Sequence, residues 1–286
     1  MPLERFAVIG HPIGHSISPF IHEKLFALSG FSPEYTVLDV AELSGAMERL
    51  RMLDGFNITI PHKTAILPLL DRLDAKARLF GSVNTVKNEA GVLSGYTTDG
   101  PGCRAALETA GVPLAGRLLL LGRGGAARAI AFEAAFSADA LELDIVCRAS
   151  SLQNARILAA ELQKLCPKGS FRALDYETLA AETKRYDLAL NTTSVGMYPD
   201  TGVSVVDGEV LSRCAAAFDA VYNPVTTEFL RIAGELGLKT VGGMGMLVGQ
   251  AAEAHRIWYG AAFCPEDIAR ITGEAEAEIR RRFGGQ

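Results

Sequence analysis

The stretch RLLLLGRGGAARAIAFEAAF, residues 117–136, constrains the fold more than any other part of this 286-residue chain. Its run of leucines predicts a buried strand, its glycines predict a tight turn, and its alanine-rich remainder predicts a helix. A second apolar strand, LELDIVC at 141–147, follows. A buried strand, a helix and another buried strand in succession indicate a βαβ unit, so the chain is expected to belong to the α/β class.

The same alternation of short apolar strands and amphipathic segments runs through the first hundred residues, where it predicts a parallel α/β layer. The expected strands there are FAVIG, YTVLDV and FNITI, and the expected helices begin near Ser18, near residue 41 and just beyond Pro61. Glycines and a proline near residue 100 mark a change of unit. Beyond the βαβ unit, strands are expected at 187–191, 216–222 and 239–241, and helices at 246–259 and 265–283.

Charge and cysteine content exclude several classes of protein. Lys and Arg number 28 against 33 Asp and Glu, and the net charge of −5 is spread without a long block of either sign. This balance disfavours nucleic acid as a partner, and we interpret the basic run at 280–282 as a solvated helix end. The five cysteines lack CxxC spacing, which predicts neither a disulfide framework nor a zinc ribbon and fits a reducing cytoplasm.

Membrane association and metal binding are not predicted either. The N-terminus has no signal-peptide pattern, and no apolar run approaches the roughly 18 residues that span a bilayer. His11, His15, His22 and His62 crowd the first motifs, but they lie on separate expected elements and show no metal-ligand spacing. A small molecule is therefore the expected partner.

The glycine turn of the βαβ unit is the first candidate site. Gly122, Gly124 and Gly125 follow a strand and precede a helix, where glycines let the backbone approach a pyrophosphate at the helix N-terminus. The spacing is GxGGAA and not GxGxxG, so Ala127 would supply the small residue for close helix packing. A tight turn that binds nothing is the alternative, and these residues alone leave it open.

The end of the next strand bears on which dinucleotide such a turn would bind. Arg148 follows the strand directly, and an arginine at this place accommodates the 2′-phosphate of NADP. Asp144 stands about 20 residues after the glycines, where a carboxylate would select NAD through the ribose, but it lies inside the expected strand. NADP is therefore the predicted cofactor, and NAD bound through Asp144 is the alternative.

Lys63 and Asp99 are the candidates for chemistry. Lys63 follows the strand in NITIPHKTAI, close to Thr59, at an expected strand-to-helix junction where a cation is mildly unfavourable. Asp99, in TTDG, lies at the expected change of unit. Each has an ordinary alternative: Lys63 as a solvated surface lysine, and Asp99 as the N-cap of a helix that begins near Gly102.

A series of motifs, taken in order along the chain, resembles those of the shikimate dehydrogenase family. They are GHPIGHSISP, FNITIPHK, GSVNT, TTDG, GRGGAA, NTTSVGM, DAVYNP and GGMGMLVGQAAEA. The resemblance implies an N-terminal α/β substrate domain and a Rossmann-like nucleotide-binding domain, with C-terminal helices that return to the substrate domain and the site in the cleft. The implied substrate (catalytic) domain comprises residues 1–100 and 246–286, and the implied NADP-binding domain comprises residues 101–245.

The resemblance also implies roles for individual residues. Lys63 and Asp99 match the family's catalytic groups. The implied substrate-binding residues are Ser16, Ser18, Thr59, Asn84, Tyr222 and Gln250, with the two serines and the tyrosine on the substrate carboxylate. The implied cofactor-binding residues are Gly122, Arg123, Gly124, Gly125, Ala126, Arg148, Thr192 and Gly243.

The implied activity is the reversible, NADPH-dependent reduction of 3-dehydroshikimate to shikimate, a step of aromatic amino-acid biosynthesis, in a cytoplasmic monomer or homodimer. The alternatives are a quinate or quinate/shikimate dehydrogenase that uses NAD, a related enzyme acting on an aminated ring, and a non-catalytic NAD(P)-binding sensor on the same fold. The chain departs from the usual family pattern at Thr97 (usually Asn), Arg123 (usually Ala), Cys147-Arg148-Ala149 (commonly Asn-Arg-Thr) and Gly249 (often larger). Thr97 leaves the substrate open, and the second and third departures bear on the cofactor.

Overall fold

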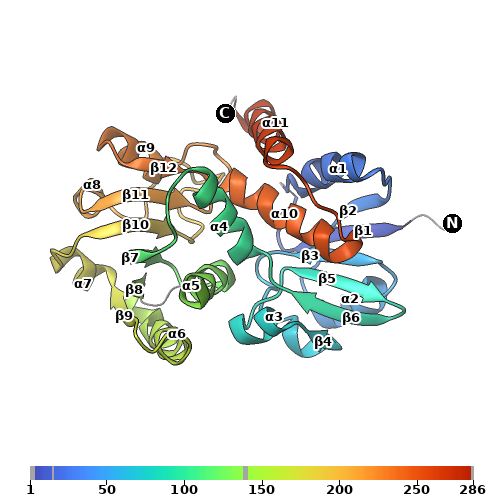
Figure 1. Ribbon diagram of the computed structural model, residues 1–286, viewed down its shortest axis with the longest axis horizontal. Coiled ribbons are helices and arrows are strands. Elements are labelled where there is room, and N and C mark those ends of the chain that lie inside the picture. The colour runs from blue at the N-terminus through green and yellow to red at the C-terminus, as the bar shows by residue number, and fades with distance from the viewer. Residues whose placement is uncertain (1–3, 15, 138–140, 285–286) are drawn as a thin grey trace. The chain divides into compact units, whose positions relative to one another are not determined.

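The computed structural model describes residues 4–14, 16–137 and 141–284. The chain divides into two compact units, each with its own six-stranded sheet (Figure 1). Unit 1 comprises Met1–Gly102 and Val248–Ala275, and unit 2 comprises Cys103–Leu247 and Glu276–Gln286. The chain passes from one unit to the other within three helices, α4 (Asp99–Thr109), α10 (Gly243–Tyr259) and α11 (Pro265–Phe283).

Unit 1 contains a mixed sheet with the strand order β2-β1-β3-β5-β6-β4. The elements that precede α4 are β1 (Arg5–Gly10), α1 (Ser18–Ser29), β2 (Glu34–Asp39), α2 (Leu43–Leu50), β3 (Gly55–Ile58), the 3-10 helix η1 (Leu67–Leu69), β4 (Arg72–Leu73), α3 (Ala75–Phe80), β5 (Thr85–Glu89) and β6 (Val92–Tyr96). β1 runs parallel to β2 and β3, but β5 runs antiparallel to both β3 and β6. The three expected strands are confirmed, whereas the expected all-parallel layer is wrong.

The sheet is mixed because β5 and β6 form a hairpin that the sequence reasoning missed. It turns at Ala90 and Gly91, whose φ angles of 53° and 88° are both left-handed, as tight two-residue hairpins require. The N–H of Gly91 donates to Asn88 Oδ1 at 2.9 Å and closes the turn. The hairpin brings the start of β5 and the end of β6 to the sheet edge where β3 ends, since Asn57 lies opposite Thr85.

The helix expected just beyond Pro61 is also wrong. Residues 61–66 form successive turns, and only the short η1 follows them. A helix would need the Lys63 carbonyl to accept from the Leu67 N–H. Instead, that carbonyl accepts from the Val83 N–H at 2.8 Å, and Leu67 donates to the Thr64 carbonyl. The bond from Val83 thus takes the Lys63 carbonyl out of a helical pattern, although the Ile66 N–H still donates to the His62 carbonyl at 3.0 Å.

Helices cover both faces of the unit 1 sheet. Ala7 and Ile9 of β1 pack with Leu43 and Leu50 of α2 on one face. On the other face, an aromatic cluster joins β1 to α1 and α10; its buried members are Phe6, Phe26, Ala254 and Trp258. Successive side chains of a strand point to opposite faces of the sheet, so β1 contributes to the cores on both faces.

Unit 2 contains an all-parallel sheet with the order β12-β11-β10-β7-β8-β9. Its elements are β7 (Gly116–Leu121), α5 (Gly125–Ser137), β8 (Leu141–Cys147), the 3-10 helix η2 (Ala149–Ser151), α6 (Leu152–Leu165), β9 (Ser170–Asp175), α7 (Tyr176–Ala181), β10 (Tyr186–Asn191), α8 (Gly208–Leu211), β11 (Cys214–Asp219), α9 (Glu228–Glu235) and β12 (Lys239–Val241). Numbered from β7, this order is 6-5-4-1-2-3, the doubly wound order of dinucleotide-binding folds. The α/β class and the βαβ unit are confirmed; β9 was not foreseen.

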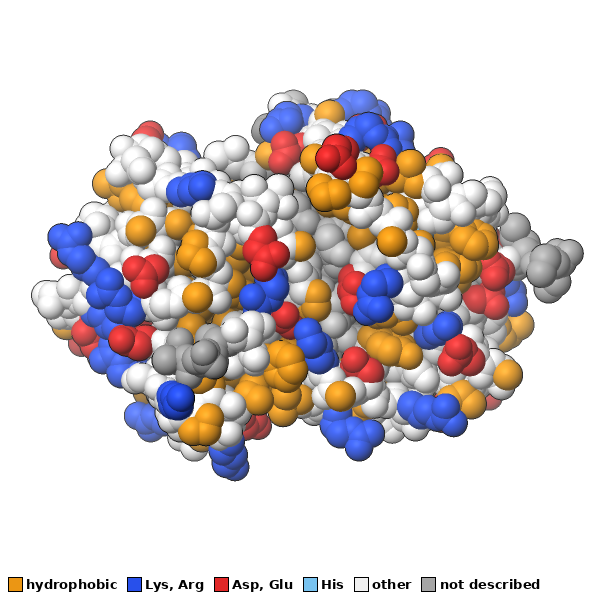
Figure 2. Space-filling view, in the orientation of Figure 1, with side chains coloured by type: hydrophobic (Ala, Val, Ile, Leu, Met, Phe, Trp, Pro, Cys, Tyr) orange, Lys and Arg blue, Asp and Glu red, His pale blue; other side chains and the backbone are white. Residues whose placement is uncertain are grey.

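The basic run near the C-terminus is paired within its own helix. Arg280 contacts Glu276 at 3.3 Å, and Arg281 and Arg282 both contact Glu278 at 2.6 Å. Figure 2 accordingly shows acidic and basic side chains mixed over α11. These contacts confirm the interpretation of a solvated helix end. Across the described ranges, no helix is long and apolar enough to cross a membrane.

Candidate active site

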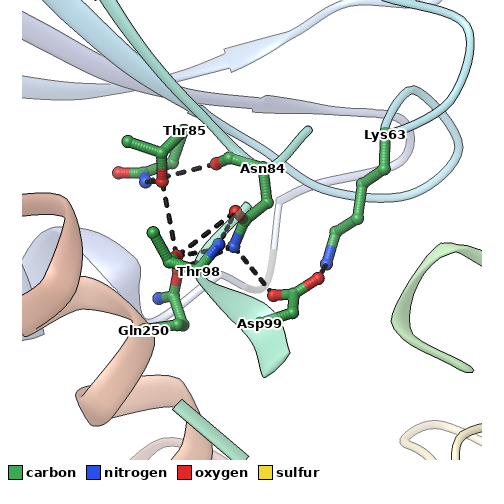
Figure 3. A network of polar contacts seen from close by, with 7 residues as sticks. Lys63, Asn84, Thr85, Thr98, Asp99 and Gln250 are labelled. Carbon is green, nitrogen blue, oxygen red and sulfur yellow. Dashed lines mark hydrogen bonds and ion pairs between the residues drawn. The ribbon is translucent and has the colours of Figure 1, made fainter. Parts of the chain in front are cut away.

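A lysine and an aspartate form an ion pair at the edge of the unit 1 sheet (Figure 3). Lys63 Nζ lies 2.5 Å from Asp99 Oδ2, and the two side chains are only 15% and 5% exposed. The ordinary interpretation of Lys63 as a solvated surface lysine is therefore wrong. Asp99 is the first residue of α4, and both of its oxygens are engaged by side chains, since Oδ1 accepts from Asn84 Nδ2 at 2.8 Å.

Asn84 is the centre of a buried network that holds the aspartate. Its Oδ1 accepts from the Thr98 N–H at 2.7 Å, and its Nδ2 also lies 2.9 Å from Thr98 Oγ1 and 3.3 Å from Gln250 Oε1. Gln250 comes from α10 within unit 1. An amide oxygen accepts while its nitrogen donates, so this pattern permits one orientation of Asn84 and thereby fixes Asp99.

Topology explains why residues so distant in the sequence meet. Lys63 follows β3, Asn84 precedes β5, and Asp99 follows β6; the hairpin places these three strand ends at one edge. β1 is parallel to β3, so Ser16 and Ser18 also follow a strand that ends at this edge. Ligands of α/β sheets bind beyond the carboxyl ends of parallel strands, which makes this edge the candidate active site.

The remaining predicted residues of unit 1 lie on the loops of the same edge without a direct contact to the ion pair. The Ser18 N–H donates to Ser16 Oγ at 3.2 Å at the start of α1. Thr59 packs against the backbone of Gly10 so closely that a Cβ there would lie 2.5 Å from Thr59 Cγ2. Their roles toward a substrate stay predictions.

A further polar layer lies behind the network, and the sequence reasoning assigned it no role. Tyr35 OH donates to Asn57 Oδ1 at 2.8 Å, and Asn57 Nδ2 donates to Thr85 Oγ1 at 3.1 Å. Thr85 in turn lies 3.4 Å from Thr98 Oγ1. Asn57 and Thr85 could have been noted as polar residues at buried strand positions, but nothing in the sequence singles out Tyr35.

Two departures from the family pattern lie beside these residues. Thr97 is 5% exposed, and its hydroxyl has no hydrogen-bond partner among the described residues. Gly249 precedes Gln250 on α10, where a Cβ would lie 3.3 Å from the Cα of Gly102 on α4. The glycine thus allows the two helices to approach closely at this point.

The carboxyl edge of the unit 2 sheet contains the glycine turn, between β7 and α5 at the point where the strand order reverses. Gly122 has φ +117°, and a Cβ there would lie 2.6 Å from Thr192 Oγ1, so this turn needs glycine. A Cβ at Gly124 would meet no atom of the described residues within 4 Å. Close packing therefore does not explain why residue 124 is a glycine. A glycine here would leave room for a pyrophosphate at the N-terminus of α5. Ala127 is fully buried, as close helix packing requires.

The structure answers the question about Asp144. This carboxylate is 1% exposed in the middle of β8, where Arg172 pairs with it through two nitrogens at 2.8 and 2.6 Å, and Tyr186 OH donates to it at 2.8 Å. It has no path to a ribose, so the NAD alternative that rested on Asp144 is wrong. Arg148 is exposed, and neither Arg148 nor Arg123 has an ion pair in the part of the chain described. Burial raises the pKa of the Cys147 thiol, and the charge of Arg123 opposes that shift.

The other predicted residues of unit 2 lie on neighbouring loops. Thr192 donates to the Leu121 carbonyl through its N–H at 2.9 Å and its hydroxyl at 2.7 Å. Gly243 begins α10, and a Cβ there would lie 2.5 Å from the Ala220 carbonyl oxygen. Close packing is thus sufficient to explain Gly243. Tyr222 is half-buried on the loop after β11, in unit 2.

The histidines are engaged with other protein groups. His22 Nδ1 lies 3.0 Å from His255 Nε2 in the core, and burial lowers the pKa of both, to about 3 for His255. His62 Nε2 contacts the Val40 carbonyl at 2.5 Å, and His11 contacts an aspartate. His15 lies outside the described residues. Within the described ranges, no group of three or more His, Cys, Asp and Glu side chains could hold a metal ion.

The fold and the two sheet edges together define a class: an α/β protein of two units, one with a partly buried lysine paired to a buried aspartate and one with the strand order and glycine turn of a dinucleotide-binding fold. The sequence model of the shikimate dehydrogenase substrate binding domain matches residues 8–86. A shikimate dehydrogenase (NADP(+)) of Methanococcus maripaludis strain C6 is 40% identical over 261 residues, 88% of this chain and 90% of that protein. The chain belongs to the shikimate dehydrogenase family.

Solved structures agree over nearly the whole chain. Shikimate 5-dehydrogenase from Thermus thermophilus, crystallised in complex with NADP(H) and shikimate, has a TM-score of 0.84 and 36% identity, covering 96% of this chain and 100% of that one. The ligand-free 5-ketofructose reductase of Gluconobacter sp. strain CHM43 has a TM-score of 0.79 and 30% identity, covering 95% and 98%. The fold thus also serves a protein named for a different ketone.

Proposed function

We propose that this protein is an NADP-dependent oxidoreductase that interconverts 3-dehydroshikimate and shikimate. The observation that carries the proposal is the Lys63–Asp99 pair, held at the carboxyl edge of the unit 1 sheet by Asn84. A sensor that only bound the dinucleotide would have no use for a partly buried lysine beside a fixed carboxylate. The free cysteines of this protein, four buried and one exposed, fit the reducing conditions of the cytoplasm.

Lys63 is the proton donor in the reduction. Its Nζ donates a proton to the carbonyl oxygen as negative charge develops there, and takes a proton back in the reverse direction. Asp99 stabilises the protonated lysine from 2.5 Å and keeps its Nζ in place. Asn84 occupies the second oxygen of Asp99, so the carboxylate cannot rotate away from the lysine.

The substrate is bound by hydroxyl and amide groups. Ser16 and Ser18, with Tyr222, hold the carboxylate of the ring, because hydroxyl groups donate well to an anion. Thr59, Asn84, Asp99 and Gln250 bind the ring hydroxyls. In this proposal residues 1–100 and 246–286 form the substrate domain.

Residues 101–245 form the NADP-binding domain. The chain's own residues fit the cofactor, because the space over Gly124 is open to a phosphate and the two arginines that flank Cys147 have no anionic partner among the described residues. When bound, the dinucleotide supplies the hydride. Its binding residues are proposed to be Gly122, Arg123, Gly124, Gly125, Ala126, Arg148, Thr192 and Gly243.

Initial rates test the proposal directly. The purified protein is assayed with 3-dehydroshikimate, 3-dehydroquinate and 5-ketofructose, each with NADPH and with NADH. We expect the highest kcat/KM for 3-dehydroshikimate with NADPH. A higher value for either of the other ketones, or for NADH, would replace the proposed substrate or cofactor. Binding of NADPH without turnover of any ketone would make the protein a sensor.

A further inference from the structure

Unit 2 contains a buried carboxylate that the proposed reaction does not use. Asp219 ends β11 and is fully buried. It accepts three hydrogen bonds, from Asn191 Nδ2 at 3.0 Å, from the Val221 N–H at 2.9 Å and from Thr227 Oγ1 at 2.6 Å. These groups are all neutral, and no cation pairs with Asp219 within the described residues. Burying a carboxylate among neutral donors alone is unfavourable, so its retention needs a reason.

Asn191 extends the network to the neighbouring loop. It ends β10 directly opposite Asp219 in the sheet. Its Oδ1 accepts from both the N–H and the hydroxyl of Thr193, at 3.0 and 2.7 Å, and its carbonyl accepts from the Ala220 N–H at 2.8 Å. The pair thus ties the loop after β10 to the loop after β11.

Both loops carry residues of the proposed binding site. Thr192 lies between Asn191 and Thr193 and is bonded to the Leu121 carbonyl, next to the glycine turn. Tyr222 lies between two anchors of its own loop, Val221 and Thr227, which both donate to Asp219. A small shift of either loop would move a proposed ligand-binding group.

We propose that Asn191 and Asp219 are positioning residues, whose hydrogen bond sets the placement of Thr192 and thereby the affinity for the dinucleotide. The inference rests on the proposed function, which assigns Thr192 to the cofactor. The chemistry of the pair is specific: an asparagine donates across the gap while its oxygen accepts from the loop, and an aspartate opposite it can only accept. An exchange that leaves two acceptors face to face should therefore disturb the loops without changing the size of either side chain.

Asn191→Asp makes this exchange and adds a pH signature. The new carboxyl would face Asp219 at the 3.0 Å separation of the present hydrogen bond. Two carboxyls so close share one proton, and burial already raises the pKa of Asp219 to about 6. The groups that face the pair, Thr193, Thr227 and the Val221 N–H, do not titrate. The second carboxylate raises the pKa of the shared proton still further, so the pair should be bridged by a proton at pH 6 and repel only once that proton is lost at higher pH.

The measurement is the dissociation constant for NADPH by fluorescence titration, divided by the wild-type value at the same pH. We expect a ratio near one at pH 6 that changes to about tenfold weaker binding as the shared proton is lost between pH 6 and pH 10, the loss of one hydrogen bond to a charged group. Asp207→Asn, at an exposed aspartate that caps α8, should leave the dissociation constant unchanged.

A folded Asn191→Asp protein that binds NADPH as tightly as wild type throughout this pH range would overturn the inference. If Asn191→Asp does not fold, Thr227→Val and Thr227→Ser decide: only the valine removes the hydroxyl donor to Asp219, so only it should weaken binding. Equal binding by these two variants would also overturn the inference. A wild-type protein that binds neither NADPH nor NADH would instead contradict the proposed function.

Discussion

The edges of the two sheets hold their buried carboxylates in opposite ways. Asp99 of unit 1 contacts a lysine at 2.5 Å, whereas Asp219 of unit 2 contacts only neutral donors. A carboxylate beside a lysine keeps a transferable proton within reach of a substrate, and a carboxylate among neutral donors can only accept hydrogen bonds. Burial is common to both, so the partner and not the burial indicates which edge performs chemistry.

Asp144 extends the comparison to a third buried carboxylate. Its partners are Arg172, Tyr186 and Lys184, and its own side chain is only 1% exposed. It has a cation like Asp99, but it lies in the middle of a strand, where no ligand of an α/β sheet binds. A cation partner and a position at the sheet edge are therefore both needed to indicate catalysis.

The largest effect is expected from removing the lysine. Lys63→Ala should lower kcat by about 10² to 10⁴, typical of a general acid, with a modest change in KM, because the lysine acts on charge that develops during the reaction. Asp99→Asn should behave similarly but also bind substrate less well. Steady-state rates with 3-dehydroshikimate and NADPH measure both. Lys87→Ala is the control, since this lysine of the same unit is paired with Glu89 on the hairpin; a near-normal kcat for Lys63→Ala would remove the catalytic role.

The next largest effect is expected on the pH dependence of stability, because Asp219 has neutral surroundings. Because burial raises its pKa to about 6 from the usual 3.8, the folded protein holds this proton more tightly than the unfolded chain does. The resulting stabilisation is present below about pH 4 and is lost as the pH rises through 6, a difference of about 3 kcal/mol. Asp219→Asn cannot ionise, so urea unfolding should show the variant gaining stability relative to wild type between pH 4 and pH 7. The same relative stability at both pH values would mean that Asp219 is not buried among neutral groups.

A smaller effect is expected at Arg148, the exposed arginine of the proposed NADP site. Arg148→Ala should lower kcat/KM with NADP by about tenfold or more, the value of one charge-assisted contact to a phosphate, and leave kinetics with NAD nearly unchanged. Shikimate oxidation with each cofactor measures the two effects. Arg185, exposed just before β10 at the opposite edge of the same sheet, provides the control substitution Arg185→Ala. Equal losses with NADP and NAD would remove Arg148 from the 2′-phosphate site.

The two units also differ in how much the sequence could predict. In unit 2, uninterrupted apolar strands and a glycine turn specify a parallel sheet almost by themselves, and the strands at β7, β8, β10, β11 and β12 were foreseen. In unit 1, the hairpin was missed because Lys87, Asn88 and Gly95 break the apolar alternation of its strands. That hairpin is what brings Asn84 to Asp99, so the residues of the ion pair could be named from motifs but their contact could not.

The hydrogen-bond networks behind the two sheet edges could not be predicted from the sequence for the same reason. Asn191 and Asp219 lie in motifs that resemble those of the family, yet nothing in the sequence says that they face each other across neighbouring strands, since this depends on the register of β10 and β11. Similarly, the helix expected after Pro61 is absent because a long-range hydrogen bond from Val83 takes the Lys63 carbonyl. Local propensity cannot foresee such a contact.

The smallest effect is expected at Thr97, two residues before Asp99. Its buried hydroxyl has no partner among the described residues, so it contributes no bond that a substitution could remove. Thr97→Asn offers both a donor and an acceptor at this place and should leave kcat/KM with 3-dehydroshikimate unchanged or raise it. Thr97→Val keeps the shape, should leave activity unchanged, and should raise the free energy of unfolding by about 1 kcal/mol because it removes an unpaired polar group. A large fall in activity in both variants would show that the threonine hydroxyl itself serves the reaction. It would also favour a different ring or ketone, and not 3-dehydroshikimate, as the substrate bound near Asp99.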